Sequence, residues 1–282
     1  MQWIERLNEA MEYVESHLTG TIDRERAAQI ACCSSYHFQR MFSYMAGVPL
    51  SEYIRRRKMT LAAEDLQQRD RVADVAERYG YESPTAFNRA FQAVHGMPPS
   101  SAQKPGVPLK AYARIAFQLS VRGPEQIEYR LEEMDAFRVV GFCQAIQPDL
   151  EENFVQIPKF WGEVAQSGQI EELLALADGK VPGLLGVSSC DPDTPNFYYI
   201  AVTSNAPVPD GMTEFIVPAG KWAIFSGHGP MPTAIQELEC RMVTEWMPSS
   251  GYEWSKAPDI EQYLNADPQD AKFEVWMPII RP

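Results

Sequence analysis

Two arginines, Arg40 and Arg89, occupy equivalent places in a pattern that the chain contains twice, 49 positions apart. A residue with a carboxamide side chain, Gln39 or Asn88, comes directly before each arginine. In the major groove of DNA a guanidinium pairs with guanine and a carboxamide pairs with adenine, each worth about 1–3 kcal/mol of discrimination. The alternative is that these are ordinary solvated helix faces. The repetition favours base reading.

The repeated pattern is Ser-x3-Phe-x-Arg-x-Phe-x4-Gly-x-Pro, and it spans residues 34–49 and 83–98. Serine is a good helix N-cap, and the two phenylalanines, four residues apart, share one helix face. The arginine between them projects about 200° away, so we expect it to face solvent. Glycine and proline then end the helix. Each copy therefore predicts a helix that buries two rings and exposes one arginine.

Short helical patterns rich in small residues precede both copies, at residues 27–31 and 72–76. A helix, a tight turn and a second helix with outward polar residues make a helix-turn-helix unit. The turn of the second unit is four residues longer. Between the units, residues 50–67 predict a helix of roughly 27 Å, which could hold two reading helices about one DNA turn, roughly 34 Å, apart.

The linking helix begins with four consecutive cations at residues 55–58, which suit phosphate contacts. We predict that DNA is contacted by both reading helices and by this basic run. The predicted DNA-binding residues are Tyr36, Gln39, Arg40, Arg55, Arg56, Lys58, Thr85, Asn88 and Arg89.

From about Trp3 to Lys104 the chain resembles the double helix-turn-helix domain of AraC/XylS-type bacterial transcription regulators, and within them the short stress regulators MarA, SoxS and Rob. The segments that carry the resemblance are residues 39–42, 53–60 and 76–83. It implies that the first reading helix enters one major groove and the second enters the next. Because Pro84 replaces a polar residue common in that subgroup, we expect the second helix to read DNA less strictly.

The formal charge of −13 is confined to the second part of the chain. Residues 1–108 carry 13 basic and 13 acidic side chains, whereas residues 109–282 carry 12 and 25. DNA affinity must therefore come from a local surface, since no bulk positive field exists. Acidity of the second part could favour cationic ligands, although solubility is the commoner reason for an acidic surface.

Composition also limits the class of protein. The N-terminal residues 1–18 predict an amphipathic helix without signal-peptide architecture, and no apolar run could span a bilayer, so a cytoplasmic protein is expected. Five cysteines and four histidines lack metal-ligand spacing, so we expect no metal, no cofactor and mostly small buried thiols. A redox role for the adjacent Cys32 and Cys33 stays an alternative.

After residue 124 the periodicity changes to strands and helices in the order βαββ, given twice. The expected fold is multidomain: an all-α double helix-turn-helix domain at 1–106, a linker at 107–123 and an α+β domain at 124–282. Within the linker, residues 110–121 could form a helix or a strand. A duplicated βαββ domain leaves a groove between its halves.

Residues from about 125 to 281 resemble GyrI-like effector-binding domains in five short segments that match only as an ordered set: 137–141, 158–161, 219–223, 260–264 and 273–278. The resemblance implies an organic, often cationic and aromatic, ligand in a central cleft. Glu274 and Trp276 share one strand face, which suits a cation through charge and ring contact. The predicted ligand residues are Trp161, Tyr198, Tyr199, Trp222, Glu274 and Trp276; alternatively, Trp161 and Trp222 are core and Glu274 is a solvated edge acid.

These observations predict a bacterial transcription regulator with double-stranded DNA and a small effector as partners. RNA polymerase is a further candidate partner, no membrane is expected, and the chain is a monomer or a weak dimer. The alternative is a GyrI-like hydrolase or sequestering protein fused to a DNA-binding domain, with Glu274 and Tyr198 or Tyr199 as acid and base. Because the sequence contains no nucleophile set, metal cluster or phosphate loop, we expect no catalytic residues and no enzyme.

Overall fold

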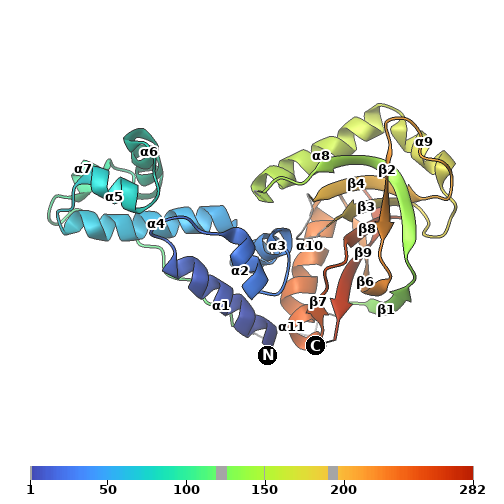
Figure 1. Ribbon diagram of the computed structural model, residues 1–282, viewed down its shortest axis with the longest axis horizontal. Helices are drawn as coiled ribbons and strands as arrows, with labels where there is room; N and C mark the ends of the chain where they lie inside the picture. Colours follow the sequence, from blue (N-terminus) through green and yellow to red (C-terminus); the bar gives the residue numbers. More distant parts are fainter. Residues whose placement is uncertain (1, 119–125, 149, 190–195, 282) are drawn as a thin grey trace. The chain divides into compact units, whose positions relative to one another are not determined.

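The computed structural model describes residues 2–118, 126–148, 150–189 and 196–281 (Figure 1). The chain divides into two compact units. The first unit comprises residues 1–31 and 46–118, and the second comprises residues 32–45 and 119–282. A short segment inside the predicted DNA-binding region therefore belongs to the same unit as the C-terminal residues.

The first unit is built of helices, as predicted. Its helices are α1 (Gln2–Ser16), α2 (Arg24–Ile30), α4 (Leu50–Gln67), α5 (Val72–Arg78), α6 (Pro84–His95) and α7 (Pro99–Ala102). Ser83 caps α6 by accepting from the backbone N–H of Ala86, and Gly96 ends it with φ of 76°. Phe87 and Phe91 are fully buried in a core shared with α4 and α5. The predicted cap, buried rings and helix end of the second copy are all confirmed.

Residues 107–118, part of the predicted linker, have neither helical nor strand conformation and lie along the first unit. Asn8 holds Phe117 through both backbone groups, at 2.8 and 2.9 Å. The His95 ring accepts from the Lys110 backbone N–H at 3.2 Å, and burial lowers the pKa of His95. Side chains therefore satisfy backbone groups that a helix or sheet would otherwise pair. Residues 119–123 of the predicted linker lie outside the described residues.

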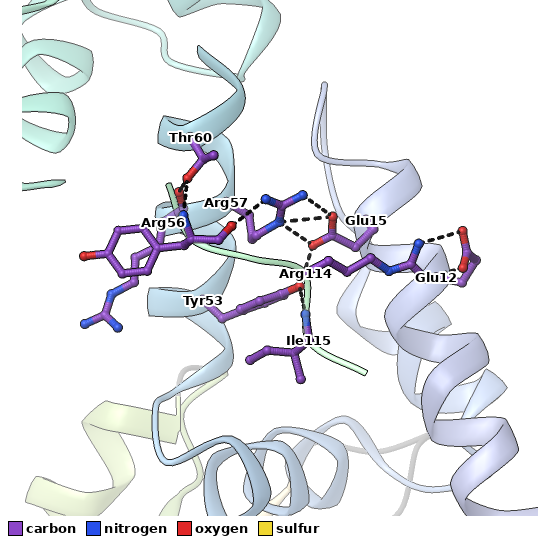
Figure 2. A network of polar contacts seen from close by, with 9 residues as sticks. Glu12, Glu15, Tyr53, Arg56, Arg57, Thr60, Arg114 and Ile115 are labelled. Carbon is purple, nitrogen blue, oxygen red and sulfur yellow. Dashed lines mark hydrogen bonds and ion pairs between the residues drawn. The ribbon is translucent and has the colours of Figure 1, made fainter. Parts of the chain in front are cut away.

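A partly buried ion pair joins α1, α4 and this extended segment (Figure 2). The guanidinium of Arg57 donates to both oxygens of Glu15 and, at 2.6 Å, to the Tyr112 carbonyl. Tyr53 donates to Glu15 at 2.5 Å and accepts from the Ile115 backbone N–H at 3.1 Å. Burial and the neighbouring Glu15 raise the pKa of Tyr53 to about 12, so the phenol stays a donor.

The second unit contains an antiparallel sheet in the strand order β1-β6-β9-β8-β3-β4-β2-β5. The strands are β1 (Tyr129–Met134), β2 (Phe137–Ala145), β3 (Leu184–Ser188), β4 (Phe197–Thr203), β5 (Thr213–Val217), β6 (Gly220–Gly229), β7 (Glu253–Trp254), β8 (Asp259–Tyr263) and β9 (Ala271–Ile280). The three strands β6, β9 and β8 on one side mirror β2, β4 and β3 on the other. The predicted βαββ duplication is confirmed, and its halves meet where β3 pairs with β8.

Helices cover one face of this sheet. They are α8 (Leu150–Gln166) and α9 (Gln169–Leu176) in the first half, and α10 (Thr233–Arg241), the π-helical turn η1 (Met242–Trp246) and α11 (Met247–Ser250) in the second (Figure 1). Val164 and Leu173 pack on Tyr198 and Ile200 of β4. The opposite face carries a separate core that includes Trp222 and Trp276. We call these the helical face and the opposite face.

The remaining element of the second unit is α3 (Ser35–Ala46), the first predicted reading helix. Ser34 accepts from the backbone N–H of His37 at 3.2 Å, and Phe38 and Phe42 are fully buried, as predicted. The expectation of buried thiols is wrong for the described cysteines: Cys32 is exposed and Cys33, Cys143 and Cys240 are partly exposed. Cys190 lies outside the described residues.

Candidate nucleic-acid interface and ligand site

The second predicted reading helix, α6, presents its polar residues as expected. Thr85 and Arg89 are exposed, and Asn88 is half-buried and accepts from the Gln92 side chain at 3.2 Å. Arg89 lies between the buried Phe87 and Phe91 in sequence, and its opposite projection follows from helix geometry. This face of α6 therefore has the exposure that base reading requires.

The basic run on α4 is only partly available for phosphate contacts. Arg55 is half-exposed and pairs with Glu52, and Arg56 pairs with the same carboxylate at 2.5 Å while stacking on the Tyr112 ring. Lys58 instead donates to the carbonyls of Gly20 and Tyr79, at 3.0 and 2.9 Å, and burial lowers its pKa. We therefore correct the expectation for Lys58, because its ammonium group ties two loops of the first unit together.

The expectation that α3 exposes its polar residues is wrong in this structure. Gln39 is 4 % exposed and Arg40 is 6 % exposed, whereas Tyr36 is half-buried. The Gln39 side chain donates to the Pro148 carbonyl at 3.0 Å, just before α8. Both faces of α3 are therefore covered, because other residues of the second unit pack on the face that the sequence pattern predicts to be exposed to solvent.

Arg40 enters a slot lined by α10, η1 and three strands. Its guanidinium makes ion pairs with Glu239 of α10 and, at 3.2 Å, with Asp259 of β8. Met242, Val243, Trp254, Val275 and Met277 complete the lining, and a cavity of only about 10 Å³ remains. That volume holds about one water. The side chain of Arg40 therefore fills the slot.

Neighbouring residues of α3 use the same two acids. His37 contacts Asp259 at 2.5 Å, and Trp254 donates to the other oxygen of Asp259 at 3.2 Å. Tyr44 donates to Glu239 at 2.5 Å. Burial would lower the pKa of Arg40, but its electrostatic interactions with Tyr44, Tyr36, Asp259 and Glu261 outweigh it and hold that pKa well above its ordinary value. Arg40 is therefore a buried, compensated cation.

A second acid on β8, Glu261, lies in an aromatic surrounding on the helical face. Tyr198 and Tyr263 both donate to its Oε2 atom, at 2.8 and 2.9 Å. Trp161 of α8 donates to the Tyr198 hydroxyl at 2.9 Å, and its ring meets that of Tyr263 edge-on at 4.8 Å. We call Trp161, Tyr198, Glu261 and Tyr263 the aromatic–acid cluster.

Backbone register makes room for this cluster. Glu261 faces Gly186 across the β3–β8 ladder, where a Cβ atom would overlap the Tyr198 hydroxyl. Burial first, and then the charge of Glu261, raise the pKa values of Tyr198 and Tyr263 well above the ordinary value. Both phenols therefore stay protonated donors around a carboxylate. An acid flanked by rings can attract an organic cation by charge and by cation–π contact.

The six predicted ligand residues do not form one cleft. Trp161 and Tyr198 meet on the helical face, whereas Tyr199, Trp222 and Trp276 belong to the core of the opposite face. Because adjacent residues of a strand point to opposite faces, Tyr198 and Tyr199 cannot line the same site. The expectation of one shared site is therefore wrong, and the alternative of a core position holds for Trp222.

Glu274 lies at the rim of a different cavity. Both of its oxygens accept from Arg130, at 2.6 and 2.7 Å. It lines a space of about 260 Å³ together with Arg130, Lys180, Gln262 and Trp276. The predicted free acid is therefore already paired with a cation. The alternative acid–base pair of Glu274 with Tyr198 is not formed, because the two side chains lie on opposite faces.

The described residues contain neither a membrane-spanning helix nor a metal-binding cluster. Within 2–118, 126–148, 150–189 and 196–281, no helix has the length and apolar character to cross a membrane. The same part of the chain holds no group of three or more His, Cys, Asp or Glu side chains that could bind a metal ion.

The chain is a helix-turn-helix regulator with a small-molecule binding domain. Residues 127–280 match the family described as GyrI-like small molecule binding domain, and residues 27–104 match a helix-turn-helix domain. The chain thus belongs to the GyrI-like family and carries an AraC-type helix-turn-helix domain. Both predicted resemblances are confirmed.

Other proteins are similar to parts of this chain. The HTH-type transcriptional activator AarP of Providencia stuartii is 36 % identical over 95 residues, which are 33 % of this chain and 70 % of AarP. The multiple antibiotic resistance protein MarA of Escherichia coli (strain K12) is 33 % identical over 94 residues, 33 % of this chain and 74 % of MarA. The structure of SAV2435 bound to tetraphenylphosphonium covers 55 % of this chain and 94 % of its own, with 24 % identity and a TM-score of 0.49.

The sequence analysis missed the three acids of the helical face, Glu239, Asp259 and Glu261. A signal was present for two of them, since Asp259, Glu261 and Tyr263 alternate on β8 with the buried Ile260 and Gln262. Acids at every second position of an inner strand indicate a polar site. No comparable pattern marks Glu239, which lies among polar residues on α10.

Proposed function

We propose that α6 and α3 read two successive major grooves of double-stranded DNA, with Thr85, Asn88 and Arg89 on α6 and Tyr36, Gln39 and Arg40 on α3. The exposed polar face of α6 supports the first part. The recurrence of the same pattern in α3 supports the second. Contact with RNA polymerase and a monomeric or weakly dimeric state stay predictions.

The reading helix that is exposed here gives the sharper test. Arg89→Ala should lower affinity for a DNA fragment selected from genomic DNA by the full-length protein by about 1–3 kcal/mol. Lys104→Ala, which removes an exposed cation after α7, is the matched control and should change affinity far less. Fluorescence anisotropy at one fixed salt concentration measures both. Equal affinity of wild type and Arg89→Ala would remove α6 from the interface.

We infer further that the second unit binds an organic cation with aromatic groups at the aromatic–acid cluster. The observation that carries this proposal is the carboxylate of Glu261 held by two phenols beside an indole. Coulomb attraction selects the charge, and a ring face adds about 0.5–2 kcal/mol. Family membership supports a small molecule and leaves its charge to this geometry.

A matched pair of dyes tests the charge. Crystal violet is a triaryl cation, and its leuco form carries the same three aryl groups on a tetrahedral central carbon without the charge. Glu261→Gln should weaken crystal violet binding about tenfold, or about 1.4 kcal/mol, in calorimetry, and should leave the leuco form almost unaffected. Glu172→Gln, on the exposed surface of α9, is the control. Equal losses for both dyes would contradict a role for charge.

A further inference from the structure

Helix α3 contacts the rest of the second unit through polar side chains, in the way that a bound ligand contacts its site. Its polar side chains reach Pro148 before α8, Asp259 on β8 and Glu239 on α10. The helix therefore lies across the helical face between the two halves of the duplicated domain. These contacts come from both halves, since Pro148 precedes α8 of the first half whereas Asp259 and Glu239 belong to the second.

The group that α3 inserts has the chemistry that the site attracts. Arg40 carries its cation between two rings of its own helix, with Tyr36 at 5.8 Å and Tyr44 at 5.9 Å from the guanidinium carbon. Its acid partner Asp259 is two residues from Glu261, on the same face of β8. Arg40 therefore presents a cation flanked by aromatic rings, and this cation lies beside the aromatic–acid cluster.

We propose that α3 is an internal ligand of the second unit, and that a cationic effector competes with Arg40 for the acids of the helical face. The docked helix keeps Gln39 and Arg40 from DNA, since both are almost fully covered. Displacement by the effector exposes them. DNA reading by α3 and docking of α3 are then mutually exclusive. This inference rests on the cation-binding function proposed above.

The balance of forces makes such docking reversible. Removing a guanidinium and carboxylates from water is costly, and ion pairs with good geometry roughly offset that cost. The net affinity of the docked helix is therefore modest, whereas the specificity for a cation is high. A ligand shifts this equilibrium only by its preference for one state. A competing cation has that preference, because it binds only when Arg40 has left.

Hydrogen exchange of the full-length protein tests the docking. Glu239→Gln removes one charge from the Arg40 slot, and Tyr44→Phe removes the phenol that donates to Glu239. Amides of residues 35–46 should exchange about tenfold faster in Glu239→Gln, and faster to a smaller extent in Tyr44→Phe. Glu237→Gln, exposed on the same helix, is the matched control and should match wild type. Wild-type exchange of α3 in both test variants overturns the inference.

The two dyes then separate this inference from the function on which it rests. Crystal violet should speed exchange of residues 35–46 in the wild type, and its leuco form should not. If crystal violet binds with dependence on Glu261 but α3 keeps its exchange rate, competition is refuted while cation binding stands. If crystal violet does not bind even to Glu239→Gln, the cation function is refuted, and faster exchange in that variant supports docking alone.

Discussion

A guanidinium that is 6 % exposed needs compensation, and Arg40 has it from Glu239 and Asp259. Its helical position between Phe38 and Phe42 correctly predicts that it points away from those rings. Local spacing cannot predict what covers the far side of a helix, because the covering acids lie about 200 residues further along the chain. The outward direction of Arg40 was therefore predictable, and its burial was not.

Charge compensation also governs Glu15, whose pKa is lowered from its ordinary value of 4.5. Burial opposes this shift, and the hydrogen bonds from Arg57 and Tyr53 overcome it. A carboxyl pKa that is depressed by folding adds stability above its unfolded value, and that stability is lost as pH falls through the folded pKa. The first unit should therefore weaken in acid below about pH 4.5 through this group.

Glu15→Gln tests this dependence. It should cost about 1–3 kcal/mol of unfolding free energy at pH 7, since Arg57 and Tyr53 lose a charged acceptor. The loss should shrink as pH falls below about 4.5 towards 3, because the Glu15 carboxyl of the unfolded chain is protonated first and this reduces the stability that the folded carboxylate contributes. Urea unfolding followed by circular dichroism at both pH values measures the difference. Glu12→Gln, on the exposed side of the same helix, is the control, and a pH-independent loss in Glu15→Gln would contradict the assignment.

At the scale of elements, local patterns predicted most boundaries. Helix α4 has the predicted bounds, Leu50–Gln67. The single helix that the second βαββ unit predicts is instead divided into α10, η1 and α11. A π-helical turn has no simple sequence signature and is frequent at functional sites. Here η1 supplies Met242 and Val243 to the slot that holds Arg40, so the departure from prediction lies at the site.

Two glycines, one in a helix and one in a strand, differ in the space that they leave for an added Cβ atom. Gly162, inside α8, has open space where a Cβ atom would stand, so Gly162→Ala should stabilise the second unit by about 0.5–1 kcal/mol. At Gly141 on β2 the same atom would overlap the Ile200 carbonyl and Ala201, so Gly141→Ala should cost about 1–3 kcal/mol or more. Thermal unfolding compares the pair. Destabilisation by Gly162→Ala would contradict the open surface of α8.

At the scale of the whole molecule, the structure explains part of the uneven distribution of charge. The excess of acids lies in residues 109–282, and three of those acids form the helical face that receives α3. An acidic surface attracts a cationic helix and repels DNA phosphates, so both effects oppose DNA binding while α3 is docked. The sequence predicted the two domains and the charge asymmetry. It did not predict that residues 32–45 belong to the second unit, because that depends on tertiary contacts.

If α3 is an internal ligand, as we propose, the second unit withholds a DNA-reading helix from DNA. The most direct measurement is the dissociation constant of full-length Glu239→Gln for the fragment selected by the wild type, at fixed salt. Because the variant keeps every predicted DNA-contacting residue, freeing α3 should tighten binding about tenfold, or 1.4 kcal/mol, whereas Glu237→Gln should bind like wild type. Equal tightening in both variants would indicate a general charge effect. Unchanged or weaker binding by Glu239→Gln would contradict the claim.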